Sequence, residues 1–350
     1  MRLRDSTNTY KDLIDYGIEL GHEVIAITEH ETISNAVKVE KYYKKIKEKH
    51  PDFKVILGNE IYLCRDGLDA SNYIRGEDYY YHFILLAKDA IGHQQIRELS
   101  SRAWGRSYSS YAMTRVPTYY QDLIDIVKPN SGHIIGSTAC IGGFLPRKIL
   151  QWVGTNDPTL WDKIKNWCFL MQGIFGEKDF YFEMQPSNNP EQVTVNKTLL
   201  KLSQELNIPY IITTDSHYLK KEEAPIHKAF LNAQDGEREV DAFYASTYMM
   251  STTELEEYFK YFDNDVLQMA YNNIQGIKNK CEDYSLLRPL KIPELKWKTV
   301  DKEIPEPEFS KLIAQIPMLN TFMNSPYKSD KYLVGAVVDG ILRHPDLQNK

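Results

Sequence analysis

The stretch Tyr210-Ile-Ile-Thr-Thr-Asp-Ser-His-Tyr218 decides the fold that we expect for this chain. Its first half is apolar or β-branched and carries no charge, which predicts a buried strand of a parallel sheet. Asp215 and His217 follow at the end of that strand, and residues two apart in an extended segment point to the same side. Carboxylate oxygen and imidazole nitrogen together suit Zn, Mn or Fe. Alone, such a pair is more often turn chemistry beside a hydrogen-bonded histidine, so the metal interpretation depends on the rest of the chain.

Length and composition limit the classes of protein that the chain can belong to. Its 350 residues suffice for one large α/β barrel of about 250 residues, or for two ordinary domains. The net charge of −6 argues against a globally basic nucleic-acid surface but leaves room for a local groove. We find neither a signal peptide nor an apolar run near the roughly 18 residues of a membrane span, so we expect a cytoplasmic protein. The four cysteines contain no CxxC pair and indicate neither disulfides nor a zinc knuckle: Cys64, Cys140, Cys168 and Cys281.

Apolar strand patterns alternate with amphipathic helical patterns along the chain. A helical face over 12–20 comes first, and a buried strand over 24–28 follows it. Repeated strand-then-helix order predicts a parallel sheet, either open or closed into a barrel. The further strands are expected at 55–62, 80–87, 133–137, 180–184 and 210–214.

Side chains that could bind a metal recur at these strands. A carboxylate inside an apolar strand, such as Glu60, needs a partner or a metal ion. In a (β/α) barrel the carboxyl ends of all strands meet on one face, so ligands from distant segments can converge there. The residues in question lie in or directly after strands: His30, Glu60, His82, Cys140, Asp215 and His217.

Five ordered motifs together resemble the polymerase and histidinol phosphatase (PHP) domain, in the form found at the N-terminus of bacterial and phage DNA polymerase III alpha subunits. The resemblance covers roughly residues 2–295 and implies a distorted (β/α)7 TIM-like barrel with a trinuclear metal site. The motifs are Ala26-Ile-Thr-Glu-His30, Leu57-Gly-Asn-Glu60, His82-Phe-Ile-Leu-Leu-Ala87, Ser137-Thr-Ala-Cys-Ile-Gly-Gly143 and Thr214-Asp-Ser-His-Tyr-Leu219.

One part of the family pattern has no counterpart in this sequence. Members of the family open with a strand ending in His-x-His, whereas Arg2-Leu-Arg-Asp-Ser6 resembles the segment just after that pair, so the first strand is expected to be missing. The resemblance assigns one metal ion to Asp5, His30 and His217, and another to Glu60, His82 and Cys140. The third ion would need the absent pair with Glu60 and Asp215. We therefore expect two ions of Zn, Mn or Fe, with Asp215, His217 and Glu60 as catalytic residues.

The resemblance also implies a domain organisation. Residues 1–290 are expected to form the PHP barrel, and residues 291–350 the start of the connection into a polymerase body. The sequence contains no carboxylate cluster beyond the barrel that could hold the two metal ions of nucleotidyl transfer, so we do not expect this chain to be a polymerase by itself. A short gene product and a fragment of a longer reading frame both fit the sequence.

Three functions are consistent with the sequence. The first is metal-dependent 3′–5′ exonuclease proofreading of single-stranded DNA within a replicative polymerase, weakened by the lack of His-x-His. The second is a non-catalytic module that braces the polymerase and binds the rest of the replisome or a proofreading exonuclease subunit. The third is a free-standing phosphatase for small esters. Arg106, Arg115 and the tyrosines between them could stack on single-stranded DNA or merely cover the barrel.

Overall fold

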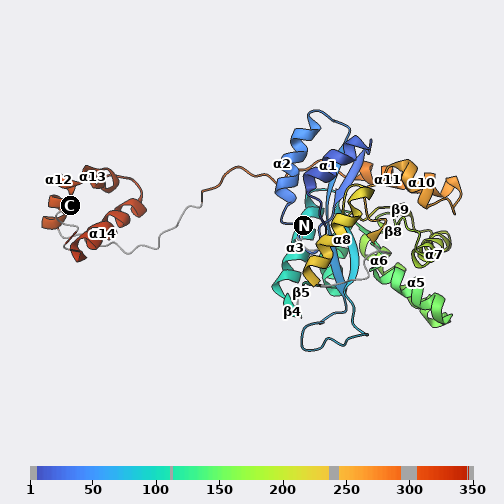
Figure 1. Cartoon of the computed structure of the whole chain (residues 1–350). Helices are drawn as coiled ribbons and strands as arrows, with labels where there is room; N and C mark the ends of the chain where they lie inside the picture. The colour runs from blue at the N-terminus through green and yellow to red at the C-terminus, as the bar shows by residue number, and fades with distance from the viewer. Residues whose placement is uncertain (1–5, 111–112, 236–243, 293–305, 345, 347–350) are drawn as a thin grey trace. The chain divides into compact units, whose positions relative to one another are not determined.

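The computed structural model describes residues 6–110, 113–235, 244–292, 306–344 and 346 (Figure 1). The chain divides into two compact units, Met1–Leu287 and Arg288–Lys350. The predicted ligand Asp5 lies outside the described residues.

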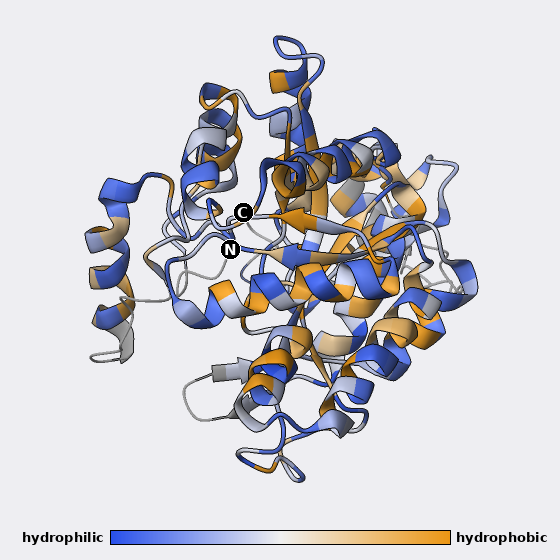
Figure 2. Cartoon of the chain, turned by 90° about the vertical axis from the view of Figure 1, so that its right-hand side faces the viewer, coloured by the Kyte–Doolittle hydropathy of each residue, from blue (hydrophilic) through white to orange (hydrophobic). Residues whose placement is uncertain are grey.

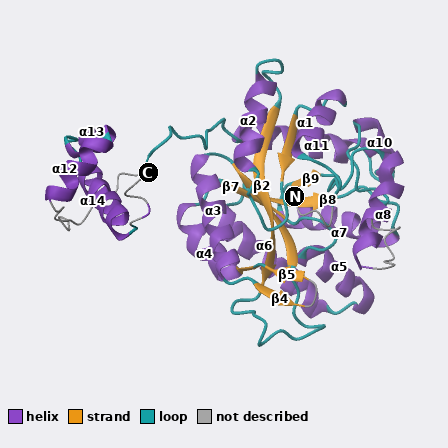
Figure 3. Ribbon diagram, turned by 60° about the vertical axis from the view of Figure 1, so that its left-hand side comes forward, coloured by secondary structure: helices purple, strands orange, loops and turns teal. Residues whose placement is uncertain are grey.

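The first unit is built on one mixed sheet. Six of its strands follow one another in the order β1-β2-β3-β7-β8-β9, and β6 pairs with β2 outside this path. Figure 3 shows these strands in the middle of the unit, with helices around them. The strands are β1 (Val24–Ile27), β2 (Lys54–Cys64), β3 (Tyr81–Ala87), β6 (Pro117–Tyr119), β7 (Ile134–Ser137), β8 (Phe180–Met184) and β9 (Tyr210–Ile212), and a separate hairpin joins β4 (Tyr108–Ser110) to β5 (Met113–Arg115).

The direction of β3 corrects the prediction of a parallel sheet. The other neighbouring strands run parallel, but β3 is antiparallel to both β2 and β7. The physical reason is that no helix lies in the described segment between β2 and β3, so the chain returns directly along β2. The start of β3 therefore lies at the edge where β2 and β7 end, and the register pairs His82 with Tyr62.

Apolar side chains from every strand of the six-strand path fill the concave side of the sheet. Because side chains alternate across a strand, one residue in two along each strand points to this side. Helix α11 (Asn264–Lys280) contributes to the same cluster. The cluster contains Val24, Ile56, Ile84, Leu86, Ile135, Tyr181, Ile211, Ile274, Ile277 and Cys281.

Helix α11 also ties the two end strands of the open sheet together. The side-chain amide of Asn273 donates to the carbonyl of Tyr210 in β9 at 2.8 Å. Near the C-terminal end of the helix, the ammonium of Lys278 lies 2.8 Å from the carboxylate of Glu23, the residue before β1. The described part of the sheet is thus closed by a helix rather than by strand pairing.

The remaining helices of the first unit pack around the outside of the sheet, where a large apolar core forms between them and the strands. The helices in view carry hydrophobic and hydrophilic residues on different faces (Figure 2). These elements are α1 (Tyr10–Glu19), α2 (Ala36–Lys47), α3 (Ala90–Gly105), α4 (Tyr120–Ile126), η1 (Lys128–Asn130), α5 (Phe144–Thr155), α6 (Pro158–Phe175), α7 (Pro190–Leu206), η2 (Lys221–Glu223), α8 (Ala224–Asp235) and α10 (Thr252–Tyr258).

The buried histidine His93 of α3 is expected to make the stability of the first unit depend on pH. Its side chain is 2 % exposed, neither ring nitrogen has a hydrogen-bond partner among the described residues, and burial lowers its pKa to about 4. The unfolded chain, with an ordinary histidine pKa near 6.5, therefore takes up this proton first as the pH falls. The stability contributed by the neutral imidazole is complete above about pH 6.5 and is lost towards pH 4, a loss of about 3 kcal/mol.

Urea unfolding at pH 7 and at pH 4.5 tests this dependence in the wild type and in a His93→Leu variant. The variant should lose about 2–3 kcal/mol less than the wild type between the two pH values. His50→Leu, at an exposed position, is the matched control and should follow the wild type. Equal losses in the wild type and His93→Leu would contradict the assignment.

The second unit is a small helical assembly. Its helices are α12 (Glu306–Gln315), α13 (Pro317–Met323) and α14 (Lys328–Arg343). Leu312, Leu319, Val334 and Val338 form its core. In the described parts of both units, we find no helix long and apolar enough to cross a membrane.

Candidate metal centre

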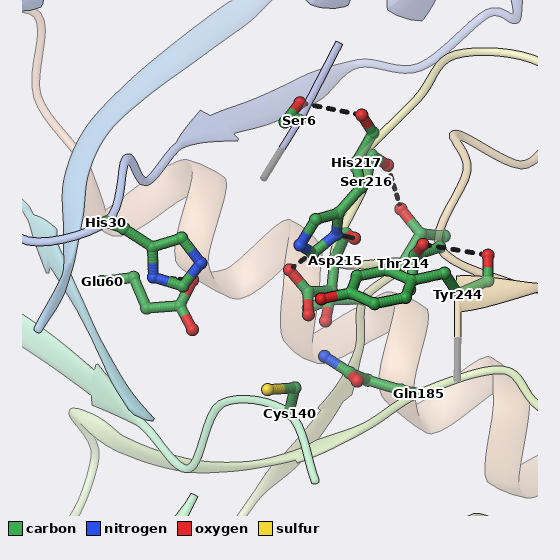
Figure 4. A network of polar contacts seen from close by, with 12 residues as sticks. Ser6, His30, Glu60, Cys140, Gln185, Thr214, Asp215, Ser216, His217 and Tyr244 are labelled. Atoms are coloured by element: carbon green, nitrogen blue, oxygen red, sulfur yellow. Dashed lines mark hydrogen bonds and ion pairs between the residues drawn. The ribbon is translucent and has the colours of Figure 1, made fainter. Parts of the chain in front are cut away.

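The predicted ligands that the structure describes gather above the apolar cluster on the concave side of the sheet. Side chains two or four residues apart in a strand point to the same face of the sheet. Glu60 lies four residues beyond the core residue Ile56 in β2, so both point to the concave side. In β3 the reversed chain direction has the same effect, since His82 lies four residues before Leu86. Figure 4 shows five of these side chains converging on a common space: His30, Glu60, Cys140, Asp215 and His217.

Glu60 links two histidines from different segments. Its Oε1 lies 2.7 Å from Nδ1 of His82, and its Oε2 lies 3.5 Å from Nδ1 of His30. The segment after β1 is held at this place because His30 forms a parallel bridge with Glu60. One ligand atom from each of the three residues lies within 4.8 Å of the others, so His30, Glu60 and His82 could hold a metal ion together.

Cys140 extends this group from the loop after β7. Its Sγ lies 3.3 Å from Nδ1 of His82, and its side chain is buried. The loop is fixed against β3 by a backbone bond from the His82 amide to the Gly142 carbonyl and by a bridge between His82 and Gly143. A thiol and an imidazole are thereby brought within reach of the same ion.

Asp215 and His217 face the group from the segment after β9. The Nδ1 of His217 is 2.7 Å from the main-chain oxygen of Asp215 and 3.7 Å from its carboxylate. The main-chain oxygen of His217 accepts from the amide of Thr7 at 3.0 Å and from the hydroxyl of Ser6 at 2.8 Å (Figure 4). Ser6 and Thr7 therefore lie beside His217. The resemblance assigns the preceding residue, Asp5, to one ligand set with His217.

Burial controls the electrostatics of these donors. Burial, with a smaller contribution from the nearby Asp215 and against the opposing effect of His30, raises the pKa of Glu60 to about 8. Burial likewise holds the pKa of the Cys140 thiol well above its usual value, and Asp215 and Glu60 act in the same direction. Glu60 and Cys140 are buried and Asp215 is half-buried beside them, so a cation between them would relieve both the desolvation and the mutual repulsion.

Glu183 is a buried acidic residue of this region that the sequence analysis missed. It is the last residue but one of β8, and it accepts from the hydroxyls of Ser137 and Thr213 at 2.5 Å each and from the Gln185 amide at 3.3 Å. Burial raises its pKa. Its three donors come from β7 and from the segments after β8 and β9, so it ties those strand ends together below Asp215. The signal that marked Glu60, a carboxylate in an apolar strand, is also present in Phe180-Tyr-Phe-Glu-Met184.

The backbone adopts left-handed conformations next to the candidate ligands. Glu31, Ala139 and Asp215 have φ values of 56°, 56° and 47°. The other described non-glycine residues with positive φ are asparagines that terminate helices, Asn156 and Asn207. Residues in this sparsely populated region cost about 1–3 kcal/mol each and persist where the surroundings impose them. The left-handed residues Glu31, Ala139 and Asp215 thus lie in the turns that contain the candidate ligands His30, Cys140 and Asp215.

The donor set fits a divalent transition metal. Imidazole, thiolate and carboxylate together suit Zn, Mn or Fe, and the buried carboxylate Glu60 gains a counter-charge when an ion is bound. The three-residue group combines His30, which the resemblance places in one ligand set, with Glu60 and His82, which it places in the other. His217 and Asp215 lie across the same space (Figure 4).

Comparison with known proteins agrees with this architecture. The sequence profile of the PHP domain matches residues 1–187, which is more than half of the chain, so the chain belongs to the PHP family. Relatives of known name are DNA polymerases. The chain is 35% identical over 356 residues to "Probable DNA polymerase YorL" of Bacillus subtilis and to "DNA-directed DNA polymerase" of Bacillus phage SPbeta, matches that cover 97% of this chain. It is 29% identical over 296 residues, 82% of this chain, to the "DNA polymerase III subunit alpha" of Borreliella burgdorferi.

These relatives are much longer than the present chain. The match covers 27% of the two Bacillus proteins and 23% of the Borreliella subunit. The chain thus corresponds to about a quarter of the length of the polymerases that it resembles.

Proposed function

We propose that the first unit is a metal-dependent phosphoesterase centre that hydrolyses the 3′-terminal phosphodiester of single-stranded DNA. The observation that carries the proposal is the group of His30, Glu60 and His82, whose ligand atoms lie within 4.8 Å of one another. Cys140 Sγ lies 3.3 Å from His82, and Asp215 and His217 face the group from the opposite side. Imidazoles, a thiol and carboxylates from five separate segments that meet in one place are typical of a metal site.

The residues divide into holding and reacting roles in this proposal. Two divalent ions of Zn, Mn or Fe would supply a nucleophilic water and neutralise the phosphate charge. His30, Glu60, His82 and Cys140 hold the site. His217 is oriented by its bond to the Asp215 main chain, so its ring and the Asp215 carboxylate are positioned to guide the water and its proton.

The sequence similarity to polymerases supports a role in DNA replication. We propose that the PHP unit, residues 1–290, works beside the body of a replicative polymerase, with residues 291–350 as the start of the connection into that body. DNA and the remainder of the polymerase are then the partners, together with a proofreading exonuclease subunit in the replisome. The relatives named above carry the names of DNA polymerases.

Hydrolysis by the 350-residue chain is expected to be weak, because no His-x-His pair occurs in its sequence. We therefore expect that adding a His-x-His segment ahead of Arg2 raises the hydrolysis rate by about 10-fold or more, since a further ion would stabilise the phosphate charge. The measurement is release of the 3′-terminal nucleotide from a labelled single strand with Mn²⁺ or Zn²⁺ present.

The control for this experiment is the same extension with both histidines replaced by alanine, which should stay at the level of the 350-residue chain. Full hydrolysis by the 350-residue chain that is abolished by Asp215→Asn would show that two ions suffice. Absence of both hydrolysis and bound metal in every form would overturn the phosphoesterase and favour a module that only braces the polymerase.

A further inference from the structure

A group of tyrosines and arginines lies next to the candidate metal centre and has no role in it. Tyr79, Tyr80 and Tyr81 lead directly into His82 at the start of β3. The ring of Tyr80 stacks on Tyr73 at a centroid distance of 6.1 Å, and Tyr79 lies 5.6 Å from Tyr81. These are surface rings, because Tyr73 and Tyr79 expose 36 % and 37 % of their area.

Two arginines flank these rings. The guanidinium carbon of Arg115 lies 4.7 Å from the centroid of Tyr80, and that of Arg147 lies 5.3 Å from the centroid of Tyr79. Neither arginine has a carboxylate within ion-pair distance in the described part of the chain, so both keep an uncompensated positive charge. We call Tyr73, Tyr79, Tyr80, Arg115 and Arg147 the tyrosine–arginine surface.

Two buried carboxylates in the neighbouring segments are already paired with other arginines. Arg65 is paired with Asp78 and Arg106 with Asp122 at 2.7 Å, so these two carboxylates are already neutralised by arginines outside the surface. The whole chain carries a net charge of −6. A polyanion would consequently be drawn to a place such as this one rather than to the protein as a whole.

We propose that the tyrosine–arginine surface binds single-stranded nucleic acid and leads its end towards the metal centre. Exposed aromatic rings beside unpaired cations are what sequence-independent single-strand binding requires, since bases stack on the rings and phosphates meet the guanidinium groups. Tyr79 lies three residues before His82, at most about 10 Å along the chain, so the end of a strand bound beside Tyr79 can reach the metal centre. This proposal deepens the phosphoesterase proposal and rests on it for the direction of the strand.

Binding can be measured separately from hydrolysis. The probe is a fluorescein-labelled 12-nucleotide thymidine strand, titrated with the full 350-residue chain in EDTA, and fluorescence anisotropy is recorded over a range of salt concentrations. Tyr79→Ala should weaken binding by about 5-fold or more while the salt dependence stays unchanged, because a stacking contact is lost. Tyr79→Phe keeps the ring and should bind like the wild type.

Arg147→Glu should weaken binding by about 10-fold or more and reduce the slope of log affinity against log salt by about 0.7 or more, because at least one phosphate contact is lost. The matched control is Lys201→Glu, which reverses a cation that lies over the Trp161 ring on the α6–α7 surface, and it should bind like the wild type. Wild-type affinity in both Tyr79→Ala and Arg147→Glu would overturn the proposal, as would equal losses in Tyr79→Phe and Tyr79→Ala.

Hydrolysis of bis(p-nitrophenyl) phosphate by the wild-type chain with Mn²⁺ tests the metal centre without the surface, because this substrate has no bases to stack. Strand binding that responds to the variants supports the surface even when neither the wild-type chain nor the chain extended with His-x-His hydrolyses the small diester, in which case the phosphoesterase proposal fails by itself. Hydrolysis of the small diester without any strand binding would overturn the surface and leave the metal centre standing.

Discussion

Replacing Glu60 with glutamine is expected to remove most of the bound metal and to lower phosphodiester hydrolysis by about 100-fold or more. Glu60 reaches both His30 and His82 through its two carboxylate oxygens. Loss of a residue that merely orients a metal ligand costs about 10- to 100-fold, so loss of a central ligand should cost at least as much. The measurements are metal content after dialysis, by mass spectrometry, and the rate on a small diester.

The melting temperature gives a readout of this variant that does not depend on activity. A metal ion that binds only the folded chain raises the melting temperature, so Mn²⁺ or Zn²⁺ should stabilise the wild type and leave Glu60→Gln nearly unchanged. A Cys140→Ala, His217→Ala double variant should also lose metal. Glu40→Gln is the matched control. Glu40 is a buried carboxylate on α2, and it accepts hydrogen bonds from the Ser285 hydroxyl and the Leu286 amide. Metal content equal to that of the wild type in both site variants would refute the candidate centre.

The order of strands and helices and the family could be predicted because they depend on local patterns. The apolar runs around Ile25, Ile56 and Ile211 became strands of the sheet, as period and composition predict. The predicted direction of β3 was wrong. Strand-then-helix order predicts a helix between β2 and β3, but residues 65–80 form a long loop, and β3 runs antiparallel to β2. Direction depends on which strands pair, and that is a long-range property.

The site could be predicted where residue type and strand position coincide, as at Glu60 and Asp215. The convergence of His30 with Glu60 and His82 required the register between strands, which the sequence does not display. Glu183 carries the same signal as Glu60, but its partners Ser137 and Thr213 belong to other strands, so its position at the site depends on strand pairing. The role of α11 in joining β9 to Glu23 also depends on long-range packing, because Lys278 and Glu23 are more than 250 positions apart in the chain.

Gly143→Ala is expected to destabilise the first unit by about 3 kcal/mol or more and to disrupt the metal centre with it. A Cβ atom at this position would lie 2.2 Å from the Thr138 carbonyl oxygen, 3.1 Å from that of Cys140 and 3.2 Å from that of His82. All three are backbone atoms, which cannot move aside as a flexible side chain can. The loop after β7 must therefore shift, at an overpacking cost near or above the usual 1–3 kcal/mol.

The same shift would move Cys140 away from His82, because Gly143 bridges to His82 and its amide donates to the Cys140 carbonyl at 2.8 Å. Gly143→Ala should thus lose both stability in urea unfolding and metal affinity, although it removes no ligand atom. Gly173→Ala is the control: this exposed helical glycine has no heavy atom within 4 Å of the added Cβ, so alanine should stabilise α6 by about 1 kcal/mol at most. Wild-type stability and metal affinity in Gly143→Ala would mean that the loop yields without cost, and that close backbone packing is not what holds Cys140 against His82.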